Sequence, residues 1–120
     1  MATKNEESAN DGGAKDASAH DHDFDDREAL FAAITAVGTP DEARRFLTDL
    51  ATPSEIRALA ERWRIARLLD QGGNSYREIS AVTGASTTTV VRVSRFLNDE
   101  PHRGYRLMLD RLNKSPTKEN

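Results

Sequence analysis

Apolar residues recur every three or four positions along the first part of the chain, which is the spacing of one face of an α-helix. The pattern begins with Leu30, Phe31, Ile34 and Val37. It predicts a first helix over residues 24–37, which Gly38 ends.

Two further helices are expected from a shared start signal. Residues 39–42 read Thr-Pro-Asp-Glu and residues 52–55 read Thr-Pro-Ser-Glu. A Thr N-cap, Pro at the first helical position and Glu closing a capping box are typical of a helix N-terminus. One face of the second helix carries Ala43, Phe46, Leu47 and Leu50. The stripe of the third, the longest expected helix, consists of Ile56, Leu59, Ala60, Trp63, Ala66 and Leu69, and its Trp63 is expected in the core or a dimer interface.

The second half of the chain repeats these signals at shorter spacing. Residues 75–78 read Ser-Tyr-Arg-Glu and open a short helix to about Thr83, which Gly84 ends. Ser86 can cap the next helix, whose inner face carries Val90, Val93 and Leu97. A last helix carries Tyr105, Met108, Leu109 and Leu112. Because no segment alternates as a strand would, we predict an all-α fold of six helices.

The folded part is expected to be shorter than the chain. The first two dozen residues hold almost no large apolar side chain, so we expect a disordered acidic tail at 1–23, a domain at 24–112 and a polar tail at 113–120. A domain of about 90 residues buries a modest fraction of its surface. We therefore expect a homodimer.

Charge is distributed unevenly along a chain whose net charge is −3. Residues 1–39 carry three basic and nine acidic side chains, whereas residues 57–95 carry seven arginines and three acidic side chains. Nucleic-acid binding depends on the local potential of the docking face, so this basic middle is compatible with DNA binding. It is equally compatible with solvated, Arg-rich helix faces.

Composition argues against several classes of function. There is no cysteine, which removes disulfides, thiolate nucleophiles and Cys-based zinc sites. His20-Asp21-His22-Asp23 has metal-ligand side chains but no fixed geometry in a disordered tail, and His102 has no nucleophile beside it. With neither an apolar run of membrane length nor a secretory signal, we expect a cytoplasmic protein without cofactor, metal, membrane association or enzymatic activity.

Residues 75–97 read as a helix-turn-helix. Ile79 and Val82 can pack the first helix onto Val90 and Val93 of the second, and Gly84 tolerates the left-handed backbone of a sharp turn.

The second helix opens with residues 86–89, Ser-Thr-Thr-Thr, whose hydroxyls would meet base edges in the major groove. Arg77 would reach a phosphate. The threonines can equally do no more than cap and solvate an exposed helix. In that case the competing function is a protein-interaction module built on the same helix pair.

These segments resemble the Trp repressor family. The resemblance lies in residues 51–55, 62–65, 75–79 and 83–92, and residues 84–97 with 104–106 are particularly similar to the YerC/YecD-like branch. It spans roughly residues 26–112 and is ungapped through the third to fifth helices. It implies an intertwined homodimer whose helix-turn-helix regulates transcription on double-stranded DNA, most often as a repressor. It also implies that the DNA surface includes Tyr76, Arg77, Ser86, Thr87, Thr88 and Thr89.

The resemblance further implies a ligand frame. Founding members hold tryptophan between two arginines, which match Arg62 and Arg92, with Thr52 near the ligand's ammonium. Here Val93 and Phe96 replace a glycine and a serine beside that site, and both add bulk where the indole would lie. Because such side chains turn a pocket into core, we expect a regulator that tryptophan does not gate. The alternative is a regulator gated by an amino-acid-like ligand between the two arginines.

Overall fold

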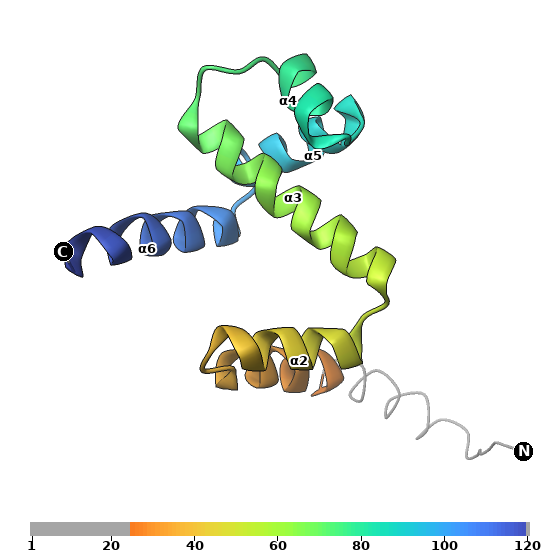
Figure 1. The fold of residues 1–120 in the computed structure, drawn as a ribbon, viewed down its shortest axis with the longest axis vertical. Helices are drawn as coiled ribbons and strands as arrows, with labels where there is room; N and C mark the ends of the chain where they lie inside the picture. The colour runs from red at the N-terminus through yellow and green to blue at the C-terminus, as the bar shows by residue number, and fades with distance from the viewer. Residues whose placement is uncertain (1–24, 120) are drawn as a thin grey trace, which may run out of the picture. The chain divides into compact units, whose positions relative to one another are not determined.

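The computed structural model describes residues 25–119, with side chains as far as Lys114. Within this range the chain is all-α, with six helical segments and no strand. A first segment covers residues 25–36, and the others are α2 (Pro40–Leu50), α3 (Pro53–Gln71), α4 (Tyr76–Thr83), α5 (Thr87–Asn98) and α6 (Gly104–Glu119) (Figure 1). The predicted acidic tail at 1–23 lies outside the described residues. No helix within them is both long and apolar enough to cross a bilayer.

The predicted capping boxes of α3 and α4 are complete. In α3, the Thr52 hydroxyl accepts from the Glu55 backbone N–H at 3.1 Å, and the Glu55 carboxylate accepts from the Thr52 N–H at 2.8 Å. Ser75 and Glu78 make the same two bonds at the start of α4, at 3.1 and 2.7 Å. Each box satisfies two backbone donors that a helix start would otherwise leave open.

Only one of the two hydrogen bonds expected for a capping box at the start of α2 is present. Thr39 accepts from the Glu42 N–H at 3.1 Å as predicted. The Glu42 carboxylate, however, accepts from the Gly38 N–H at 2.8 Å, one residue before the expected donor. The side chain of Glu42 is long enough to reach either donor, so spacing alone does not decide between them.

The chain divides into two compact units, with the boundary between Phe46 and Leu47. In the described part of the first unit no residue is fully buried. Leu30, Val37 and Phe46 are half-buried, but Phe31 and Ile34 keep 53% and 49% of their surface exposed. The predicted apolar faces are therefore only partly covered by this chain.

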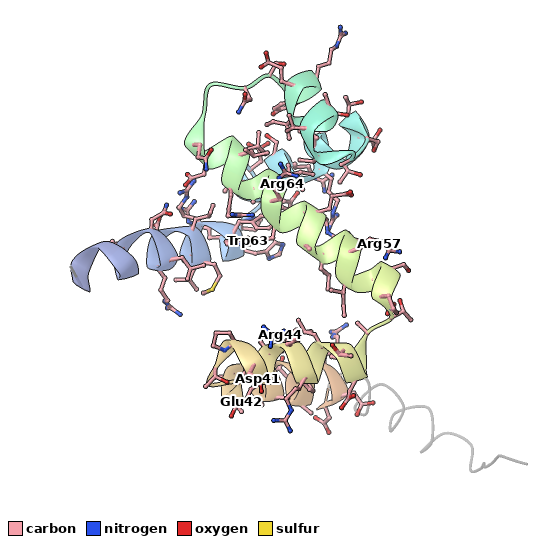
Figure 2. All side chains as sticks on the ribbon, viewed as in Figure 1. Asp41, Glu42, Arg44, Arg57, Trp63 and Arg64 are labelled. Atoms are coloured by element: carbon pink, nitrogen blue, oxygen red, sulfur yellow. The ribbon has the colours of Figure 1, made fainter. Side chains whose placement is uncertain are left out.

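The second unit contains the core, built where α4, α5 and α6 pack on α3 (Figure 1). Its central cluster consists of Ile65, Ala66, Ile79, Ala85, Val90 and Val93. Trp63 of α3 packs against this cluster (Figure 2). Its ring stacks on that of Tyr105 of α6, with centroids 6.4 Å apart. Burial of these side chains removes apolar surface from water and fixes how the helices are rotated about their axes.

An ion pair joins the end of α3 to α6. One Arg106 Nη donates to Asp70 Oδ1 at 2.9 Å and lies 3.3 Å from Asp110 Oδ1, and Asn113 donates to the other Asp70 oxygen at 3.4 Å. The hydrogen bond to Asp70, and then that to Asp110, raises the pKa of Arg106 above its ordinary value.

The predicted apolar faces of α3 and α6 are only partly buried in this chain. Leu59 and Ala60 of α3 are exposed, whereas the fully buried Ile65 was not expected in the stripe. On α6, Leu109 is buried, whereas Met108 and Leu112, which belong to the same predicted stripe, are 37% and 54% exposed. Helical periodicity gives a wide apolar face, and only the part covered by a neighbouring helix becomes core.

The last helix is also longer than expected. α6 continues to Glu119, whereas the apolar stripe on which its end was predicted stops at Leu112. Polar residues such as Lys and Glu are good helix formers, so backbone helix can outlast the apolar face.

Candidate nucleic-acid interface

The turn between α4 and α5 is built from its own side chains. Gly84 adopts φ 81° and ψ −1°, the left-handed conformation that the sequence predicts, and its N–H donates to the Ser80 carbonyl at 2.9 Å. The Ser80 hydroxyl donates to the Ala85 carbonyl at 2.5 Å, and the Ala85 N–H donates to the Thr83 hydroxyl at 3.2 Å. These bonds hold α5 at a defined angle to α4.

One of the two predicted packing residues of α4 is in the core. Ile79 is fully buried with Val90 and Val93 of α5, as expected. Val82 is 57% exposed, so its predicted contact with α5 is wrong. In an α-helix position i+4 shares a face with position i, and here the half-buried Thr83 rather than Val82 continues the face of Ile79.

Tyr76 connects α4 to the inner face of α5. Its hydroxyl lies 2.5 Å from the Ser94 hydroxyl, and Ser94, only 8% exposed, also accepts from the Asn98 side-chain amide at 3.4 Å. Tyr76 as a whole stays 43% exposed. Sequence reasoning placed Tyr76 at the surface and missed Ser94, although Ser94 shares the face of Val90 and Leu97 and could have been found by that spacing.

The four hydroxyl residues at the start of α5 fall into two pairs. Ser86 is the N-cap: its hydroxyl accepts from the Thr89 N–H and lies beside the Thr89 hydroxyl, both at 3.1 Å. Thr87 and Thr88 are exposed, and within the described residues their hydroxyls have no hydrogen-bond partner. The first pair builds the helix start, and the second is available to a ligand.

Arg77 lies in the first turn of α4 and is exposed. Among the described residues it has no ion-pair partner. A cation near the positive end of a helix dipole gains nothing for the fold, so this side chain is suited to an anion that approaches from outside.

Arg62 and Arg92 line one open pocket of about 380 Å³ beside the core. The remaining lining residues are Leu59, Phe96, His102, Gly104 and Tyr105. The Arg92 guanidinium lies over the Phe96 ring, 4.4 Å from its centroid. Val93 is fully buried, as expected for a residue that turns pocket into core, but Phe96 forms a wall of the remaining space rather than filling it.

Thr52 is not brought to that pocket. It is absent from the lining, and its hydroxyl caps α3. Two of the three residues of the expected ligand frame are thus brought together, and the third has a structural role.

No group of three or more His, Cys, Asp or Glu side chains that could hold a metal ion occurs in the part of the chain that the structure describes. His20-Asp21-His22-Asp23 lies outside that part.

The family description "Trp repressor protein" matches residues 25–113 of the chain. Among curated proteins, the chain is 41% identical over 90 residues to the uncharacterized protein YerC of Bacillus subtilis, covering 75% of this chain and 85% of that protein.

Two solved structures are similar to the chain. A TrpR like protein from Eubacterium eligens superposes with a TM-score of 0.66 at 40% identity, covering 72% of this chain and 87% of the other. A candidate Trp repressor from Staphylococcus aureus superposes with a TM-score of 0.66 at 37% identity, covering 72% of this chain and 84% of the other.

Proposed function

The chain belongs to the Trp repressor family as a YerC-like member, and from this premise we propose that it is a homodimeric repressor that reads operator DNA with α5. Members of the family are DNA-binding transcription regulators rather than enzymes. A regulator of this class acts where the chromosome lies, so the proposal includes a cytoplasmic location.

The observation that carries the proposal is the exposed start of α5 on a rigid support. Thr87 and Thr88 present hydroxyls without partners in the described chain, while Ser86 fixes the helix end behind them. In the proposed complex these two threonines meet base edges in the major groove, where a hydroxyl can donate or accept and the Thr methyl can contact thymine.

Neighbouring residues have supporting roles in this proposal. Arg77, in the first turn of α4, binds a phosphate of the DNA. The exposed side chain of Tyr76 lies against the backbone of the DNA strand that carries this phosphate. Ser86 and Thr89 act mainly through the helix start that they build, since their hydroxyls bond each other.

The homodimer is supported by apolar surface that this chain leaves uncovered. Phe31 and Ile34 in the first unit, Leu50 and Leu59 in the second, and Leu107 and Leu112 on α6 are each about half exposed. A partner subunit that covers these side chains would remove their apolar surface from water. Two-fold symmetry then predicts an approximately palindromic operator.

We also propose that tryptophan does not gate this regulator. Val93 belongs to the core, and the Arg92 guanidinium lies over the Phe96 ring instead of in open space. A second candidate is favoured by the pocket between Arg62 and Arg92, which has room and charge for a small carboxylate. Calorimetry with tryptophan tests the first proposal: no heat is expected, and micromolar saturable binding would contradict it. Saturable heat with another amino acid would support the second candidate.

Selection of bound fragments from the source genome tests the proposed function. We expect recovered fragments to share an approximately palindromic site, and binding to that site to weaken steeply as salt rises. If no fragment is enriched and binding is indifferent to salt, the helix pair belongs to a protein-interaction module instead.

A further inference from the structure

One apolar side chain on the outer face of α5 has no role in the fold. Val91 is 51% exposed and follows Thr87 by four residues and Thr88 by three, so the three side chains share one face of the helix. Val90 and Val93, its neighbours in sequence, are fully buried. Their burial fixes the rotation of α5 and keeps Val91 facing outward.

Exposure of a single valine is ordinary for a protein surface and by itself indicates no ligand. The surroundings of Val91 are more informative. α5 carries no acidic residue, and its two arginines are exposed. Arg95 pairs with Glu100 at 2.9 Å, and the Arg92 guanidinium lies over the Phe96 ring. An apolar contact point beside the outward hydroxyls of Thr87 and Thr88 suits a ligand that carries an isolated apolar group among polar ones.

DNA offers such a group in the major groove. Thymine is distinguished there by its 5-methyl group, which apolar side chains recognise by contact, whereas base-edge donors and acceptors require a polar partner. A valine can contact the methyl group but cannot pair with the base-edge donors and acceptors. It would favour a thymine over a cytosine at the same position, because cytosine presents an amino group and no methyl.

We infer that Val91 is a specificity-determining residue that contacts the 5-methyl group of a thymine in each half-site of the operator. The inference rests on the proposed function, in which the outer face of α5 enters the major groove. It assigns to Val91 a thymine contact in addition to the base contacts proposed for Thr87 and Thr88.

Deoxyuridine provides the test, since it pairs as thymidine does and lacks only the methyl group. Each thymine of a selected operator duplex is replaced by deoxyuridine in turn, and the affinity of the full-length protein is measured by fluorescence anisotropy. We expect one symmetric pair of replacements to weaken binding by about fourfold per half-site, the factor for losing contact with one methyl-sized group.

The variant Val91→Ala should lower affinity for the unmodified operator and lose its sensitivity to deoxyuridine at that position. Alanine is a strong helix former, so α5 is expected to remain intact. Val82→Ala is the matched control, because Val82 is a comparably exposed valine on α4 and should leave the deoxyuridine effect unchanged.

Wild-type protein that binds the operator equally well with every thymine replaced overturns the inference, as does Val91→Ala with an undiminished deoxyuridine effect. Either result would leave operator binding by α5 standing. A protein that prefers no duplex at all overturns the proposed function and, with it, this inference.

Discussion

At the start of α5, neighbouring Ser and Thr residues have different roles although their side chains are chemically similar. Ser86 and Thr89 bond each other and the backbone, whereas Thr87 and Thr88 face outward without a partner among the described residues. Replacing Ser86 by Ala should therefore lower the free energy of unfolding by about 1 kcal/mol through the lost N-cap. Chemical denaturation measures this change. An unchanged unfolding midpoint would show that the cap contributes nothing.

Arg77 should act on DNA affinity without affecting the fold. Replacing it by Ala is expected to weaken binding to all duplexes alike and to reduce the salt slope by about 1, because one phosphate contact is lost. Titrations at several salt concentrations measure the slope. Arg57→Ala is a matched control, since Arg57 is also exposed but lies on α3, outside the helix pair (Figure 2). Equal slopes for the two variants would contradict the phosphate contact.

At the scale of elements, local signals predicted helix starts well and burial less well. Thr52, Ser75 and Ser86 cap α3, α4 and α5 because their hydrogen bonds are made within three residues of sequence. The burial of a side chain depends on which helix packs against it, and the spacing of apolar residues in the sequence does not specify that helix. Val82 and Leu112 are therefore exposed although they fall on predicted apolar faces.

Element contacts also decide how much of the candidate site could be predicted. The turn at Gly84 follows from a glycine between two helical patterns, and its left-handed backbone confirms that reasoning. The bond from Tyr76 to Ser94 joins residues 18 positions apart, and no short-range pattern connects them. The open pocket beside Phe96 likewise depends on the position of α6, which the sequence does not specify.

The contact between Arg106 and Asp70 is expected to hold α6 on α3. Replacing Arg106 by Met keeps most of the apolar stem and should cost about 1 kcal/mol, because Asp70 then loses its charged partner. Because the pKa of Arg106 is raised in the folded protein, the stabilisation by this ion pair is lost only at a pH above the pKa of an ordinary arginine. The cost of Arg106→Met should therefore be the same at pH 6 and pH 9. Thermal unfolding at both pH values measures it. Arg111→Met, an exposed control on α6, should change stability little.

At the scale of the whole molecule, the proposed homodimer would cover the exposed apolar side chains and would require a two-fold symmetric operator. Ile34→Glu should shift the protein from dimer to monomer in sedimentation velocity, because it places a charge in the proposed interface at a residue that is 49% exposed in this chain. Val82→Glu, a control on an exposed α4 position outside the proposed dimer surface, should remain dimeric. A wild-type protein that sediments as a monomer at micromolar concentration would contradict the homodimer.

Sequence-specific DNA binding by the outward residues of α5 is the central property of the proposed repressor. The most direct measurement is the ratio of affinities for a selected operator and a scrambled duplex, compared between wild type and the double variant Thr87→Ala/Thr88→Ala. We predict that the ratio falls by about tenfold or more, since base contacts are worth roughly 1–3 kcal/mol each, while affinity for the scrambled duplex stays the same. An unchanged ratio, in a variant that folds as the wild type does, would contradict the claim that α5 reads DNA.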